Sequence, residues 1–308
     1  MSRTTFEDLL NAGVHFGHLR RKWNPAMAPY IFMERNGIHI IDLYKTIAKI
    51  DESASALKQI ARSGKKVLFV ATKKQAKELV AEQVTRVNMP YVTERWPGGM
   101  LTNFATIRKA VRKMVSIDKL MTSASYNNMS KKERLTITRE RAKLEKNLGS
   151  IADLNRLPSA IFIVDILKER IALAEARKLN IPTFAIVDTN SDPRMVDFPI
   201  PANDDASKSI SVIVEIMVNA IEEGLVERKL DRDKRPEEEH AEVQDEDLDG
   251  QEGALTEEMV MEEDGIKISR KDFVESKITR KKDEEVTGEG DKKPQRKRIS
   301  KPVGKSKK

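Results

Sequence analysis

The sequence predicts an α/β fold, namely a doubly wound parallel sheet with an inserted α-helical hairpin and a disordered C-terminal tail. Short apolar segments alternate with amphipathic segments between residues 65 and 224, as in a parallel sheet covered on both faces. A basic segment with a heptad pattern occupies residues 103–156. Large apolar residues become scarce after residue 226. We therefore expect a folded domain at 1–226, with the hairpin inside it, and a tail at 227–308.

Two strands joined by a tight turn are expected near the N-terminus. YIFME (30–34) and IHIID (38–42) flank Arg35-Asn36-Gly37, and Asn-Gly between apolar runs is a strong hairpin signal. A helix is expected to follow as far as Arg62, because apolar residues recur there every three or four positions. Gly64 stands where the end of a helix favours positive φ.

Strands and helices then alternate along the domain. Strands are predicted at 65–72, 89–96, 159–165, 181–188 and 198–203. Helices are predicted at 73–87, 168–180 and 204–224. The last strand is bounded by prolines, which suit the edge of a sheet.

Two heptad seams predict that the segment 103–156 forms an antiparallel coiled-coil hairpin. The first seam contains Phe104, Ile107, Val111, Met114 and Met121, with Asp118 in one position. The second contains Ile137, Leu144, Leu148 and Ile151, with Arg141 in one position. The apolar stripe is narrow, so much of the hairpin must face solvent or a partner.

The tail is highly charged. Residues 236–264 contain 14 acids and no Lys or Arg, whereas residues 291–308 contain nine basic residues and one acid. Few large apolar residues are available there to form a core, so we expect disorder.

Composition excludes several classes of protein. There is no cysteine, which excludes disulfides and thiolate metal sites. The N-terminus lacks the pattern of a secretory signal, and no apolar run approaches the ~18 residues of a membrane span. We therefore expect a cytoplasmic protein with no membrane partner.

Positive charge is concentrated in the predicted hairpin. The whole chain carries a net charge of +7, and residues 103–156 contain 13 Lys and Arg against 5 Asp and Glu. Such a concentration of positive charge favours a polyanionic partner.

The glycine pair in TERWPGGMLTNFATIRK (93–109) allows two interpretations. Gly98 and Gly99 could form a catalytic phosphate loop or a tight turn that needs glycine. The motifs GxGxxG and GxxxxGK[ST] are both missing, and the turn after VLFVA contains no glycine. No nucleophilic triad is readable. We favour the turn and expect no enzymatic activity, with a nucleotide- or metal-dependent enzyme as the competing class.

A divalent metal site is one hypothesis for the carboxyl ends of the predicted strands. Asp188 ends one strand, and Asp204 and Asp205 follow the next, so their side chains would converge at one edge of the sheet. With His18 they could hold Mg²⁺ or Zn²⁺ as a structural ion. The alternative is that Asp192 forms an Asx turn, Asp204 caps a helix and the histidine is structural.

Clusters of cations beside aromatic rings fit RNA better than an enzyme. The first cluster consists of Arg20, Arg21, Lys22, Trp23 and Asn24; the second of Lys73 and Lys74; the third of Arg95 and Trp96. A ring can stack on an unpaired base while the cations contact phosphates. Any one cluster alone would be read as a solvated charge beside a half-buried ring.

Several long motifs resemble the bacterial small-subunit ribosomal protein S2 family. The resemblance covers residues 5–225 and lies in GVHFGHLRRKWNPAMAPYIF, NGIHIIDLYKT, VLFVATKKQA, RWPGGMLTNFATIRK and IPTFAIVDTNSDP. It implies a flavodoxin-like domain whose five parallel strands have the order 2-1-3-4-5. Pro97 stands where that family more often has leucine.

The resemblance also implies partners and a site. The partners would be 16S rRNA, at the junction of head and body on the solvent side, and other small-subunit proteins, including the large mRNA-binding one. No DNA partner and no required cofactor are implied. Gly98 and Gly99 would turn the chain into the hairpin. The surface offered to rRNA would include Arg95, Trp96, Thr102, Asn103, Arg108, Lys109, Arg112 and Lys113.

Overall fold

The computed structural model describes residues 3–257. The chain divides into two units, residues 1–238 and 239–308. The sheets and every side chain discussed below belong to the first unit. In the second, the described residues continue the last helix to Glu257. None of the helices within residues 3–257 is long and apolar enough to cross a bilayer.

A five-stranded parallel sheet forms the centre of the first unit. Its strands are β4 (Val67–Val70), β5 (Tyr91–Val92), β6 (Ala160–Val164), β7 (Thr183–Val187) and β8 (Phe198–Pro201). They are arranged in the order β5-β4-β6-β7-β8, and every neighbouring pair is parallel. Counted among these five strands, the order is 2-1-3-4-5, so the predicted topology is confirmed and is consistent with a flavodoxin-like fold.

Both faces of the sheet are covered, as the apolar strands require. Phe69 of β4 points into a core shared with α2 (Leu43–Arg62), α3 (Lys77–Arg86) and α8 (Ser207–Glu257). Leu68 and Val70 point into the opposite core, which α7 (Arg170–Lys178) completes. Successive side chains of a strand face opposite sides of the sheet, so a strand that is buried on both faces must be apolar at every position.

A smaller antiparallel sheet precedes this domain. After α1 (Phe6–Asn11), it consists of β1 (Phe16–Leu19), β2 (Ile31–Arg35) and β3 (Ile38–Ile41) in the order β1-β3-β2. Asn36 and Gly37 have φ of 53° and 75°, so the predicted Asn-Gly hairpin is confirmed. Strand β1 was not among the predicted strands, because its four residues, FGHL, are too few to display a period-two pattern. Short 3-10 helices, η1 (Arg20–Lys22) and η2 (Pro25–Tyr30), connect β1 to β2.

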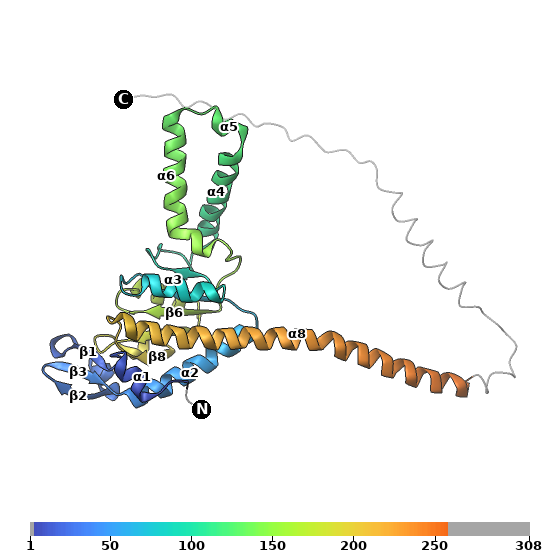
Figure 1. Ribbon diagram of the computed structural model, residues 1–308, viewed down its shortest axis with the longest axis horizontal. Coiled ribbons are helices and arrows are strands. Elements are labelled where there is room, and N and C mark those ends of the chain that lie inside the picture. Colours follow the sequence, from blue (N-terminus) through green and yellow to red (C-terminus); the bar gives the residue numbers. More distant parts are fainter. Residues whose placement is uncertain (1–2, 258–308) are drawn as a thin grey trace, which may run out of the picture. The chain divides into compact units, whose positions relative to one another are not determined.

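Two helices are inserted between β5 and β6 (Figure 1). They are α4 (Phe104–Thr122) and α6 (Lys131–Leu148), joined through the short α5 (Ala124–Asn127) and followed by η3 (Gly149–Ile151). Asp118 and Arg141, the polar positions of the two predicted seams, form an ion pair with each other. Ile117, which the predicted seam omitted, is buried. A coiled coil in the strict sense remains a prediction.

The predicted boundary at residue 226 is not a helix end. Helix α8 runs without interruption past it to Glu257. A disordered tail stays a prediction. Two ion pairs fasten the part beyond 226 to α2, between Lys58 and Glu227 at 2.6 Å and between Arg62 and Asp231 at 2.9 Å. Residues 258–308 of the predicted tail lie outside the described part.

Candidate functional site

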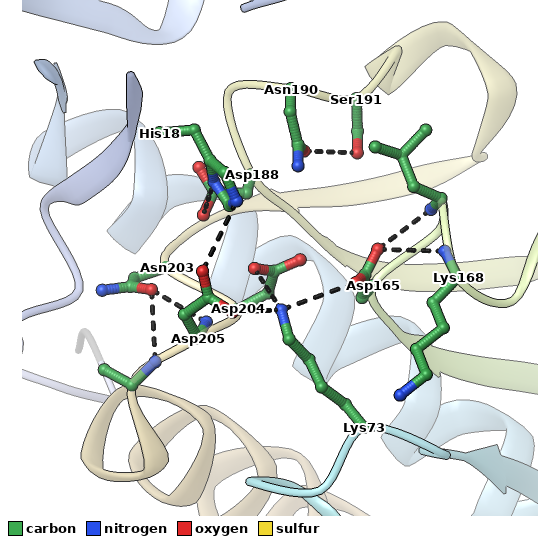
Figure 2. A network of polar contacts seen from close by, with 12 residues as sticks. His18, Lys73, Asp165, Lys168, Asp188, Asn190, Ser191, Asn203, Asp204 and Asp205 are labelled. Atoms are coloured by element: carbon green, nitrogen blue, oxygen red, sulfur yellow. Dashed lines mark hydrogen bonds and ion pairs between the residues drawn. The ribbon is translucent and has the colours of Figure 1, made fainter. Parts of the chain in front are cut away.

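Polar side chains converge at the carboxyl ends of the parallel strands, as Figure 2 shows. Asp165 follows β6, Asp188 follows β7, and Asp204 and Asp205 lie between β8 and α8. His18 of β1 and Lys73, which follows β4, join them. This is the edge at which open α/β sheets place their polar sites.

Lys73 is the central cation of this cluster. Its ammonium lies 2.8 Å from Asp204 Oδ1, 2.7 Å from Asp205 Oδ1 and 3.5 Å from Asp165 Oδ2, and the residue is 9% exposed. Burial alone would lower the pKa of Lys73, but the facing carboxylates outweigh it and raise that pKa. Three carboxylates of the protein already hold Lys73, so it would have to give up these partners to bind RNA phosphate; that role stays a prediction.

His18 faces two carboxylates. Its Nδ1 lies 2.9 Å from Asp188 Oδ2, and its Nε2 lies 3.4 Å from Asp205 Oδ2. The hydrogen bond with Asp188 raises the pKa of the imidazole. Burial, with Asp188 and Asp165 nearby, raises the pKa of Asp204 to about 7 against the opposing effect of Lys73.

Three of the four predicted metal ligands are brought together. Ligand atoms of His18, Asp188 and Asp204 all lie within 4.8 Å of one another. Within the described residues, the buried Oδ2 of Asp204 has no hydrogen-bond partner, so one oxygen is available to an ion. Asp205 is instead engaged with Lys73 and the far side of the imidazole. Asp204 does not cap α8; the side chain of Asn203 accepts the N–H groups of Asp205 and Ala206.

The loop from Trp96 to Thr102, which contains Gly98 and Gly99, surrounds the carboxylate of Glu175. Glu175 of α7 accepts hydrogen bonds through Oε1 from Trp96 Nε1 at 3.1 Å and from Gly99 N at 2.8 Å. Through Oε2 it accepts from Leu101 N at 2.9 Å and from Thr102, whose N and Oγ1 lie at 3.1 and 3.2 Å. Burial would raise the pKa of Glu175, but these donors lower it. Glu175 was not among the site residues predicted from the sequence, although it is an acid on the buried face of α7.

This contact bears on the expected roles of two residues. Trp96 is only 7% exposed and packs in the core, so its ring is not offered to a base. The N–H and hydroxyl of Thr102 both donate to Glu175. The indole of Trp96 is therefore turned into the protein, whereas Thr102 is exposed, and its placement on an RNA-binding surface stays a prediction.

Only one of the two glycines needs its conformational freedom. Gly99 has φ of +82°, whereas the φ of Gly98 is not in the left-handed region. The tight turn favoured from the sequence is thus centred on Gly99. Asn103 follows, and its side chain accepts a hydrogen bond from Thr106 near the start of α4.

The remaining predicted cations differ in how far they are engaged. Arg108 donates to the backbone and side chain of Asn155, and Lys113 pairs with Glu140. Arg20 lies 3.4 Å from Glu34. Six predicted cations are exposed and form no ion pair with the side chains described between residues 3 and 232: Arg21, Lys22, Lys74, Arg95, Lys109 and Arg112.

Trp23 and Asn24 follow the cationic turn η1. The Trp23 ring is 37% exposed and lies 5.1 Å from the His39 ring. The two rings are tilted by 44° to each other, so the indole contacts the protein through His39 while part of it stays exposed. The Asn24 side chain accepts from Ala26 N and so caps η2.

Comparison with known proteins gives one consistent family. The family described as Ribosomal protein S2 matches residues 9–224. The chain is 72% identical over 232 residues to small ribosomal subunit protein uS2 of Phocaeicola vulgatus, covering 75% of this chain and 83% of that protein. It is 70% identical to uS2 of Bacteroides fragilis and 66% to uS2 of Porphyromonas gingivalis, again over 75% of this chain and over 84% and 83% of theirs.

Proposed function

Since this chain belongs to the ribosomal protein S2 family, we propose that it binds 16S rRNA as a structural constituent of the small ribosomal subunit. Members of this family are structural proteins of translation, and the chain is not an enzyme. The position proposed for it is the junction of head and body on the solvent side, in the cytoplasm.

The observation that carries this proposal is the set of six unpaired cations, two of which lie on the inserted helix α4. Lys109 and Arg112 stand three residues apart on α4, so they share one helix face. Both are exposed and have no carboxylate partner among the side chains described up to residue 232, in contrast to Lys73 and Lys113. A cation already paired by the protein must give up that partner before it can neutralise a phosphate, whereas an unpaired one need not.

A salt titration with a 16S rRNA fragment tests RNA binding directly. If Z phosphates are neutralised, log K should fall linearly with log salt, with a slope of about −0.7Z to −0.9Z. Six unpaired cations then give a slope of about −4 to −5. A chain that joins the subunit only through other proteins would leave the fragment unbound at every salt concentration.

A second surface favours a protein partner. Phe32 and Tyr44 are 69% and 73% exposed, and the rings of Phe6 and Tyr44 stack at 5.2 Å. Met33 and Phe16, which both pair with Ile40 of β3, are each 48% exposed. Exposed aromatic side chains of this kind mark protein interfaces more often than RNA phosphate contacts. We assign docking of the large mRNA-binding small-subunit protein to this surface of the small sheet.

Replacing Phe32 and Tyr44 together by serine tests this assignment. The variant should bind the purified large mRNA-binding protein at least tenfold more weakly, because the aromatic anchors are lost. Its affinity for the rRNA fragment should stay unchanged. Leu135→Ser with Leu157→Ser is a matched control, since both leucines are exposed elsewhere. Equal docking by the aromatic variant and the parent would exclude this surface.

A structural divalent ion is the remaining proposal. His18, Asp188 and Asp204 offer one nitrogen and carboxylate oxygens, a donor set that suits Zn²⁺ and, less well, Mg²⁺. The ion would take up the unpartnered oxygen of Asp204 and fasten β1 to the large sheet. Measuring the metal content of the dialysed parent and of the dialysed Asp188→Asn variant tests whether the ion is bound. One zinc per chain in the parent and none in the variant is expected; no metal in either would contradict it.

A further inference from the structure

The loop from Trp96 to Thr102 is built as an anion cradle. Glu175 accepts five hydrogen bonds from it, three from backbone N–H groups, one from an indole and one from a hydroxyl. Glu175 is 8% exposed, and within the described residues no cation pairs with it. Clustered backbone donors around a residue with positive φ form a concave site for an anion.

Removing the anion would leave the backbone donors of this loop without their shared acceptor. The N–H groups of Gly99, Leu101 and Thr102 point at one carboxylate, and Leu101 itself is buried. Donors that are buried without a partner are costly, so the loop should rearrange or take up another anion. Trp96, Met100 and Leu101 belong to the core that α7 shares, so such a rearrangement would disturb packing there.

The loop passes directly into α4. The N–H of Asn103 donates to Gly99 O at 2.8 Å, and those of Thr106 and Ile107 donate to Asn103 O. A continuous chain of hydrogen bonds therefore leads from Glu175 through the loop to the first turn of α4. Lys109 and Arg112 lie in the next two turns of the same helix.

We propose that Glu175 is a positioning residue for RNA binding: its carboxylate fills the Trp96–Thr102 cradle and thereby fixes the direction in which α4 presents Lys109 and Arg112. The part that concerns RNA rests on the proposed function. The part that concerns the cradle does not, and the two can be measured separately. Glu175 itself touches no RNA in this account.

Trp96 gives a direct spectroscopic signal for the cradle. The chain has two tryptophans, so a Trp23→Phe background leaves Trp96 as the sole one. In that background, Glu175→Ala should shift Trp96 emission to the red and expose it to acrylamide quenching. Formate or acetate should restore the parent signal in a saturable manner, whereas chloride at equal ionic strength should not. The affinity for the rRNA fragment should fall about tenfold and recover with the carboxylate.

Glu169→Ala is the matched control. Glu169 is also a buried acid next to α7, but it accepts its hydrogen bonds from Thr72 instead of the loop. The Glu169→Ala variant should have the same Trp96 emission as the parent, and formate should not change that emission. A response to formate in this variant as well would show that small anions act on the whole fold, which would overturn the cradle.

The outcomes separate the cradle from the RNA function. Restored emission together with restored RNA affinity supports the proposal. If formate restores Trp96 emission but Glu175→Ala binds RNA as tightly as the parent throughout, the positioning role is overturned and the proposed RNA binding is unaffected. A parent that binds no RNA refutes the proposed function, and the Trp96 signal still decides whether the cradle exists. If Glu175→Ala does not fold, Glu175→Gln replaces it: unchanged quenching of Trp96 in that folded variant would overturn the proposal.

Discussion

The ammonium of Lys73 lies 2.8 Å from the carboxylate of Asp204, 131 residues further along the chain. This contact joins the end of the first parallel strand to the segment after the last one. It explains why a lysine that would suit phosphate binding by its sequence position is buried inside the protein. The polar cluster at this edge of the sheet is therefore first a structural element.

Lys73→Met should destabilise the fold strongly. The change leaves Asp165, Asp204 and Asp205 without their shared cation, and breaking a buried ion pair from one side costs about 3 kcal/mol. Urea denaturation measures the loss. The neighbouring Lys74→Met is the control and should change stability by less than about 0.5 kcal/mol, because Lys74 is exposed. Similar losses in both variants would show that the buried cluster contributes little.

Gly99→Ala should destabilise the loop, whereas Gly98→Ala should not. At φ of +82°, an alanine at position 99 is strained, and its Cβ would meet that of Asn103 at 3.3 Å. A cost of about 1–2 kcal/mol is expected from the backbone alone. At position 98 nothing lies within 4 Å of an added Cβ. Denaturation of both variants compares them, and equal stability would contradict the turn described here.

Acid should destabilise the protein partly through Glu175. Its pKa is lowered in the folded state, so its contribution is fully present above the ordinary glutamate pKa and is lost as pH falls through the lowered folded value. Glu175→Gln removes this titration. Its unfolding free energy should therefore depend less steeply on pH below about 4.5 than that of the parent. Parallel curves for the two proteins in that range would contradict the lowered pKa.

Two truncations locate the end of the folded part. Deletion of residues 239–308 should leave the melting temperature within about 2 °C of the parent. Truncation after Leu225 should lower it further, because it also removes the ion pairs of Lys58 with Glu227 and of Arg62 with Asp231. Equal melting temperatures of the two truncated proteins would support the boundary at residue 226 that was predicted from the sequence alone.

The elements that sequence periodicity encodes were predictable. Strands such as VLFV and AIFIV are buried on both faces, and this required apolar residues at every position. The Asn36-Gly37 turn was predictable because its backbone needs positive φ twice. Asp165 was missed as part of the polar cluster, although it ends a strand in the same way as Asp188.

The convergence of His18, Asp188 and Asp204 was predictable from the strand ends, but two other contacts between distant segments were not. The residues around Lys73 in the sequence give no sign that it pairs with Asp204, and those around Trp96 give no sign that it bonds to Glu175. The parallel sheet brings these residues together only after folding. Cation–aromatic clusters therefore looked like one RNA-binding surface. In the structure, Trp23 remains exposed while Trp96 and Lys73 are buried.

The central claim is that unpaired cations on α4 bind rRNA, and one charge reversal tests it most directly. Lys109→Glu with Arg112→Glu avoids Arg108, which is bonded to Asn155. Lys65→Glu with Lys208→Glu is the control, because both lysines are exposed on other elements. Affinity for a 16S rRNA fragment is measured for both across a salt titration, with circular dichroism confirming that each is folded. The α4 variant should bind at least tenfold more weakly, with a salt slope reduced by about 2, and the control should match the parent. Parental affinity of the α4 variant at every salt concentration would contradict the claim.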